Sequence, residues 1–309
     1  MTSISTDAGS TRRTRRSADF LENHHVYEAH RIGLPPMRPY FRELWRRRRF
    51  AYELSHTGLK ADHFESPLGA IWLVLNPLLL AVVYYLLVSV ISSSTRSQGS
   101  AYGFAYLAHI LIGLFTWYYV QNSMGIGATS VTAGGRLVLN QAFPRMLLPI
   151  SSVITSLLMY LPTLPVYVVI FFAGRALDPK SGLPPLGWPV LWTPVIILLL
   201  TGIGLGLAMI FATMMVYYRD TNKFLSYIIR IWLYLSPVLW TVDRLHGWHR
   251  ILLYINPVGT TIGAMTDIWI NGVQPNVTMM LSSLAWSVGL LVVGGLLFMS
   301  RERDFAVRL

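Results

Sequence analysis

The sequence has no cysteine, which excludes structural disulfides, thiolate nucleophiles and cysteine metal sites. Charge is also scarce: 13% of the 309 residues are charged, about half the share of a soluble domain, whereas 53% are hydrophobic. This composition argues against a water-soluble fold. Lysine occurs only as Lys60, Lys180 and Lys223, and none of them follows a glycine. A phosphate-binding loop ends in Gly-Lys-Ser/Thr, so the chain does not hydrolyse ATP by that route.

Five long stretches contain no charged residue, and each exceeds the roughly 20 residues that cross a bilayer. They are 66–95, 97–135, 146–174, 181–218 and 268–300. Together with one weaker segment they predict an all-α polytopic membrane protein with six transmembrane helices. Trimmed to membrane length, these are 70–91, 105–130, 149–173, 192–216, 224–242 and 277–299. The fifth is the weakest, because Arg230 lies about two turns inside its start.

The first part of the chain has a different composition. Residues 1–37 are polar and contain no apolar run like that of a signal peptide, so we expect a disordered basic arm in the cytoplasm. In 38–65, Phe41, Leu44 and Trp45 fall at helical spacing next to the arginine run 46–49. This pattern predicts an amphipathic helix on the membrane surface. The alternative for 38–65 is a solvated basic linker that orients the first span. The six-span membrane domain is then expected to comprise residues 66–309.

A segment before the last predicted span, about 243–276, contains an apolar piece that is too short to cross. It runs from Ile251 to Thr266 and is interrupted by Asn256-Pro257 and Gly259. Such a piece is typical of a re-entrant or surface-lying helical hairpin. Two extra short spans are the alternative.

The distribution of basic residues predicts the orientation. With six spans, 19 of the 25 Lys and Arg residues fall on the side of the two termini and five on the opposite side. Both termini are therefore expected in the cytoplasm. The basic arm beside apolar spans indicates anionic lipid headgroups as its contacts and not nucleic acid.

Prolines and aromatic residues give hints of a path through the membrane. Pro149, Pro162, Pro165 and Pro237 each remove a helical hydrogen bond and bend the helix, although membrane helices also tolerate proline. The fifth span combines aromatic rings with a cation, a set that could line a sugar path: Arg230, Trp232, Tyr234 and Trp240. The alternative for Arg230 is snorkelling to the headgroups, and for the aromatic residues anchoring at the interface. The glycines of 202–206 alternate without a dinucleotide-binding context, which indicates close helix packing.

Polar residues on the predicted outer side are few: Asp178, Asp243, His246, His249 and Asp267. His246 and His249 have the spacing to share a helix face, but no Glu follows the first His as a zinc-protease motif requires. We therefore predict no metal site and no catalytic residue, and interpret 246–249 as an interfacial turn.

Short motifs along the chain add a resemblance. In order they are Ser66-Pro67-Leu68-Gly69-x-x-Trp72 with Asn76-Pro77, Phe143-Pro144-Arg145 with Leu148-Pro149, Tyr218-Arg219-Asp220, Ser236-Pro237-Val238, Asn256-Pro257, and the tail Arg301-Glu302-Arg303-Asp304-Phe305-Ala306. Residues 38–309 thereby resemble the membrane subunits of ABC exporters for polysaccharides of the O-antigen and teichoic acid type. Within that family the chain looks most like galactan exporters.

The resemblance implies a permease subunit of the bacterial cytoplasmic membrane that forms a homodimer and binds two copies of a separate ATPase. ATP and Mg would be bound by that partner, with no cofactor in this chain. The loops Phe143-Pro144-Arg145 and Tyr218-Arg219-Asp220 would dock on the ATPase. Ser236-Pro237 and Asn256-Pro257 would belong to a periplasmic gate. The cargo would be a polyprenyl-pyrophosphate-linked polysaccharide.

Two other classes of function compete with this interpretation. An ion-coupled secondary transporter would need intramembrane Asp or Glu, and none lies centrally in a predicted span. A membrane-embedded sugar or lipid transferase would have to use His246, His249 and the outer aspartates. Replacing both histidines with alanine separates it from a transporter.

Overall fold

The computed structural model describes residues 34–64, 69, 71–93, 103–178, 182–245 and 247–309. In these ranges all regular structure is helical and there is no strand, as the sequence predicts. Residues 1–33 of the predicted arm lie outside the described residues, as do Ser66, Pro67, Leu68 and His246. Residues 34–309 form one compact unit.

Three helical stretches are long and apolar enough to cross a membrane: Leu147–Leu177, Trp188–Tyr217 and Val277–Arg308. The first consists of α7 (Leu147–Tyr160) and α8 (Thr163–Leu177), and the second of η1 (Trp188–Trp192) and α9 (Thr193–Tyr217). The third consists of α13 (Val277–Arg301), η5 (Glu302–Asp304) and α14 (Phe305–Arg308). The long apolar run of this stretch lies in α13. The chain is therefore a helical, multi-pass membrane protein.

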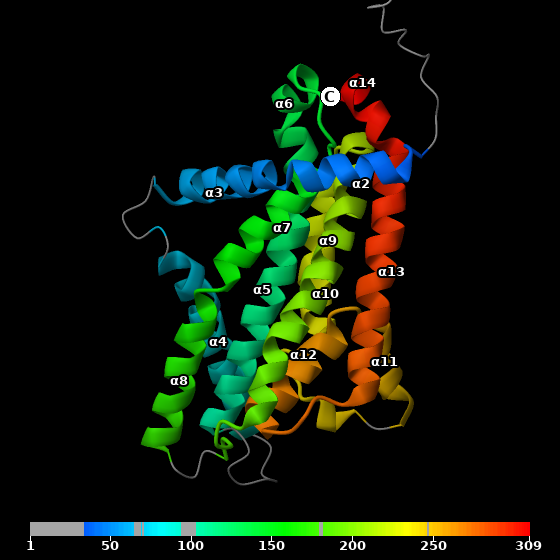
Figure 1. The fold of residues 1–309 in the computed structure, drawn as a ribbon. Coiled ribbons are helices and arrows are strands. Elements are labelled where there is room, and N and C mark those ends of the chain that lie inside the picture. Colours follow the sequence, from blue (N-terminus) through cyan, green and yellow to red (C-terminus); the bar gives the residue numbers. More distant parts are fainter. Residues whose placement is uncertain (1–33, 65–68, 70, 94–102, 179–181, 246) are drawn as a thin grey trace, which may run out of the picture. The chain divides into compact units, whose positions relative to one another are not determined.

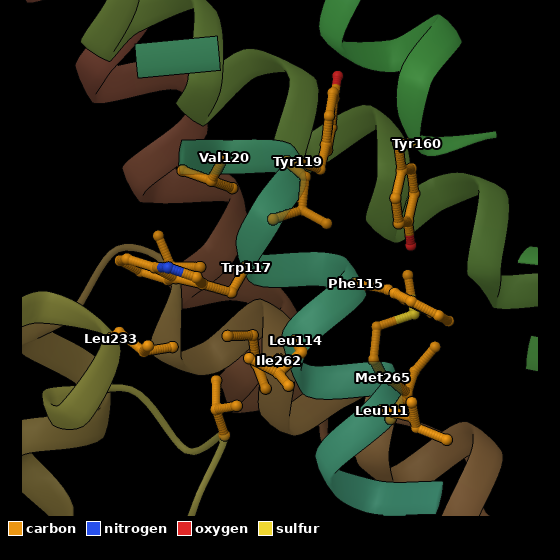
Figure 2. Packing of buried hydrophobic residues seen from close by; sticks show 14 of the residues in the cluster. Leu111, Leu114, Phe115, Trp117, Tyr119, Val120, Tyr160, Leu233, Ile262 and Met265 are labelled. Carbon is orange, nitrogen blue, oxygen red and sulfur yellow. The ribbon is translucent and has the colours of Figure 1, made fainter. Parts of the chain in front are cut away.

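The centre of the bundle is α5 (Phe104–Ala133), which packs against α4 (Ile71–Ser93), α7, α8, α9 and α12 (Gly259–Thr266). Buried residues lie on all sides of α5, which is typical of an interior helix. Figure 2 shows Phe115, Trp117 and Tyr119 of this helix among side chains from α7, α10 (Thr221–Leu235) and α12. Large aromatic side chains of α5 thus form the hydrophobic core that joins the other helices.

Gly202 and Gly206 lie where α9 meets α13, and Gly204 faces Ser123 of α5. A Cβ at Gly206 would overlap the backbone of Leu290, and one at Gly294 would overlap the backbone of Gly206. A Cβ at Gly202 would overlap Ser287. The prediction of close helix packing is confirmed, because the glycines of α9 let its backbone approach Ser287, Leu290 and Gly294 of α13.

Two predicted spans differ from the observed helices. The third is interrupted at Leu161 and Pro162, between α7 and α8, where proline cannot continue the hydrogen-bond pattern. The fifth was expected to extend to residue 242, and this is wrong: α10 ends at Leu235. Ser236 is extended (φ −93°, ψ 149°), as a residue before proline prefers to be. The 15 residues of α10 extend over about 22 Å.

The predicted surface helix 38–65 is two helices, α2 (Met37–Arg46) and α3 (Arg48–Phe64). Both run across the direction of the long helices, and α3 packs against α7 (Figure 1). Phe41 and Trp45 of α2 are exposed, Trp45 by 69%. The membrane location of these helices stays a prediction.

The apolar piece before the last span forms short helices. They are η2 (Val242–Arg244), η3 (Gly247–His249), α11 (Arg250–Ile255), α12 and the π-helical turn η4 (Asp267–Asn271). The predicted interruption at Asn256-Pro257 separates α11 from α12. With six and eight residues, neither is long enough to span a bilayer, so two extra spans are not formed. We call residues 242–276 the hairpin segment.

Candidate functional site

The motif residues gather at two opposite ends of the helices. We call one the basic end: it contains α2, α6 (Gly135–Asn140), the loops 141–146 and 218–220, and the tail 301–309. The other, which we call the hairpin end, contains the hairpin segment and the C-terminal part of α10. Figure 1 shows α6 and α14 at one end and α11 and α12 near the other.

The loop Phe143-Pro144-Arg145 is firmly attached to the basic end. The Phe143 ring lies 5.4 Å from that of Phe50 in α3, measured between centroids, and Pro144 is buried. The backbone N–H of Arg145 donates to Oε1 of Glu302 at 2.5 Å, and its guanidinium donates to the Glu302 backbone carbonyl. Arg47 adds a hydrogen bond to the carbonyl of Ala142, at 3.0 Å.

Glu302 is the polar centre of this end. It is only 9% exposed, and its Oε2 accepts a 2.6 Å hydrogen bond from the Tyr40 hydroxyl of α2. Burial raises the pKa of Glu302, outweighing the hydrogen bonds from Tyr40 and Arg145 and the positive charge of Arg145, which lower it. Burial also lowers the pKa of Arg145 and raises that of Tyr40. These three side chains border a cavity of about 390 Å³.

The second motif at the basic end, Tyr218-Arg219-Asp220, is exposed between α9 and α10, with Tyr218 exposed by 68%. Its neighbour Tyr217 contacts the tail: the hydroxyl donates to Oδ2 of Asp304 at 2.8 Å, and Arg308 lies 4.2 Å from the ring centroid. Arg301 lies 5.6 Å from the same ring. The tail 301–308 therefore contacts Arg145 of the first predicted docking loop and Tyr217, the residue that precedes the second.

The hairpin end is organised around Asn256, which is 7% exposed. Its Oδ1 accepts from Nε1 of Trp232 at 2.8 Å and from the backbone N–H of Val258 at 3.0 Å. Its Nδ2 donates to Oγ of Ser236 at 2.9 Å and to the carbonyl of Leu235 at 3.3 Å. The amide thus joins the end of α10 to the turn between α11 and α12, with both its donor and acceptor capacity used.

The predicted gate and path residues largely come together here. A cavity of about 640 Å³ is lined by Trp232, Tyr234, Trp240, Asn256 and Pro257, with leucine and isoleucine side chains completing it. Ser236 and Pro237 are buried and do not line it. The Ser236 hydroxyl accepts a hydrogen bond from Asn256, which does line it. Arg230 is exposed and does not line this cavity.

Several residues of this arrangement were not predicted as site residues: Tyr40, Tyr217, Glu302, Asp304 and His109. The buried His109 of α5 lies 3.2 Å from the Thr266 hydroxyl of α12, measured from Nδ1, and connects the hairpin segment to the core. Glu302 and Asp304 belong to the tail motif, so that motif was the one available signal. Nothing in the sequence pairs Tyr40 with a residue 262 positions later.

The outer polar residues form no metal-binding group in the part of the chain that the structure describes. There, no three His, Asp or Glu side chains form a group suited to a metal ion. His249 is exposed and stacks on Trp248, with 4.0 Å between ring centroids. Asp267 accepts a hydrogen bond from Asn271 within the π-helical turn. His246 lies outside the described residues.

Comparison with known proteins identifies the family. Residues 61–270 match the family model of the ABC-2 type transporter. The O-antigen export system permease protein RfbA of Myxococcus xanthus is 28% identical over 267 residues, which cover 86% of this chain and 97% of that protein. A protein of the same description from Klebsiella pneumoniae is 28% identical over 219 residues, covering 71% and 79%. Because the family model matches more than half of the chain, the protein belongs to the ABC-2 type transporter family.

Proposed function

We propose that the chain is the membrane subunit of an ATP-driven exporter that moves a polyprenyl-pyrophosphate-linked polysaccharide across the bacterial cytoplasmic membrane. It acts as a homodimer with two copies of a separate ATPase, which binds ATP and Mg. The chain itself contributes no catalytic residue. Support comes from the family match and from two relatives that are permeases of O-antigen export systems.

One observation carries this proposal: the two predicted ATPase-docking loops lie at the same end, and the tail contacts Arg145 of the first loop and Tyr217, the residue before the second. Arg145 bonds to Glu302 and Tyr217 bonds to Asp304, two residues apart in the tail. A partner on the basic end can therefore act on both loops together, while the aromatic cavity lies at the hairpin end. This separation fits a transporter in which the ATPase drives a distant gate.

The orientation follows from the charges. The basic end faces the cytoplasm, where positive residues are enriched, and both termini lie there. The six spans are α4, α5, α7 with α8, α9, α10 and α13, and the hairpin segment is the periplasmic gate. Residues 1–37 form the cytoplasmic arm, and α2 with α3 lies on the inner membrane surface, where the arginines 46–49 meet lipid phosphates.

The cavity at the hairpin end is the part of the substrate path closest to the gate. The rings of Trp232, Tyr234 and Trp240 offer surfaces for the apolar faces of sugars, and Asn256 is the polar group between them. Arg230 is exposed on α10 and contacts the lipid-linked phosphate. Arg230→Ala should then weaken the stimulation of ATP hydrolysis by the lipid-linked substrate. Unchanged stimulation would leave snorkelling as its role.

The docking role is tested by Arg145→Glu. A carboxylate at this position repels Glu302 and the loop no longer keeps its place, so we expect export to fall by about tenfold or more while ATP hydrolysis by the complex continues. The measurement is polysaccharide export and ATP turnover of the assembled complex in vesicles. Arg136→Glu, the same charge change at an exposed position of α6, is the control. Undiminished export with correctly inserted Arg145→Glu protein would contradict the proposal.

A further inference from the structure

The tail 301–308 contacts Arg145 of the first docking loop and Tyr217, which precedes the second, and no tail residue has yet been given a role of its own. We propose that Glu302 is a positioning residue: it fixes the Arg145 loop to the end of α13, so that a movement imposed on this loop is passed to the last span. This inference rests on the proposed function, because it requires that a partner moves the loop.

The first argument is the convergence of three distant segments on one carboxylate. Tyr40 comes from α2 and Arg145 from the loop before α7, and both donate to Glu302. The Arg145 guanidinium also bonds to the Glu302 backbone, so the side chains and backbones of the two residues are joined in both directions. Hydrogen bonds to a charged group are about twice as strong as neutral ones, and burial protects them from water.

The second argument is the direct continuity from Glu302 to the last span. Arg301 is the final residue of α13, and Glu302 follows it in η5. Phe298 of α13 and Phe305 of α14 are fully buried and pack edge to face, with 5.1 Å between ring centroids. The tail is therefore held against α13 and cannot turn about Glu302 on its own.

The third argument comes from the second loop. Tyr217 donates to Asp304 and lies under Arg308, so the tail also holds the start of the exposed loop 218–220. The two loops then have fixed positions relative to each other through Glu302 and Asp304. A tail that served only to end α13 would need neither contact.

The experiment compares Glu302→Ala, Glu302→Gln and Tyr40→Phe in the full chain. Glutamine keeps an acceptor for the Arg145 N–H, alanine removes it, and Tyr40→Phe removes only the bond from α2. The control is Glu53→Ala, an exposed carboxylate of α3. The first readout is hydrogen exchange of the backbone amide of Arg145 in the purified chain, and the second is export per ATP hydrolysed in the assembled complex.

We expect Glu302→Ala to speed exchange of this amide by about tenfold or more and to lower export per ATP by a similar factor. Glu302→Gln should change the exchange rate and the export per ATP by much less. For Tyr40→Phe we expect values of both quantities between those of Glu53→Ala and Glu302→Ala. Normal exchange in Glu302→Ala overturns the inference, as does faster exchange with unchanged export per ATP. If Arg145→Glu is impaired while Glu302→Ala transports normally, the inference alone fails. If both transport normally, the proposed function fails as well.

Discussion

The two ends of the molecule are each held by one buried polar side chain, but the chemistry differs. At the basic end the carboxylate of Glu302 only accepts, and it gathers a phenol and a backbone N–H. At the hairpin end the amide of Asn256 accepts two hydrogen bonds and donates two. A carboxylate could not serve the acceptors around Asn256, whereas an amide could partly replace Glu302. Exchanging the two chemistries should therefore have unequal effects.

The largest effect is expected for Asn256→Asp. The new carboxylate would face the carbonyl of Leu235 without a hydrogen to donate, and it would be buried. We expect the free energy of unfolding to fall by about 2–4 kcal/mol at neutral pH. The melting temperature of the purified chain in detergent, followed by circular dichroism, measures this. Asn222→Asp, at an exposed position of α10, serves as the control. Equal melting temperatures for the two variants would show that Asn256 does not hold the hairpin end.

A smaller effect is expected for Trp232→Phe. This change removes the indole N–H that Oδ1 of Asn256 accepts, but Val258 still donates to the same oxygen. The ring contact with Trp117 is partly kept. The free energy of unfolding should fall by about 1 kcal/mol, less than in Asn256→Asp. The matched substitution is Trp188→Phe, which is exposed. A loss as large as that of Asn256→Asp would mean that the indole ring, and not the amide, carries the contact.

A separate effect is the pH dependence of stability caused by Glu302. Burial raises its pKa in the folded chain above the usual 4.5, so the folded state binds the proton more tightly than the unfolded state. The resulting stability is fully present below pH 4.5 and is lost as the pH rises through the raised pKa. In Glu302→Gln this dependence should disappear, a difference of about 1.4 kcal/mol for each pH unit of that window. The measurement is the melting temperature of the unchanged chain and of Glu302→Gln at a series of pH values from 4 upward. An equal dependence of melting temperature on pH in both proteins would show that Glu302 is not its cause.

The sequence predicts local features of this fold well. The alternating glycines of 202–206 indicate close packing, and in the structure Gly202 and Gly206 face α13 while Gly204 faces α5. Asn256-Pro257 indicates an interruption, and the chain turns there. In both cases the residues that cause the structural feature are close together in the sequence, so the local sequence pattern predicts it.

Contacts between distant segments were not predictable in the same way. Beyond the end of α10 at Leu235, Ser236 accepts a hydrogen bond from Asn256, which lies 20 positions away. A charge-free run could not show this, and the predicted helix extended too far. The partner of Glu302 comes from another loop 157 positions earlier, and only the folded chain brings the two together. Composition likewise gave Arg230 and the aromatic residues of α10 one shared role, but the helix turns Arg230 away from the cavity.

The glycine contact between α9 and α13 has one more consequence. Because no side chain separates Gly206 from Leu290, neither helix can slide or rotate past the other without a steric clash. We therefore expect α9 and α13 to move together as one rigid unit. The break at Leu161 and Pro162 leaves the third span free to flex beside that unit.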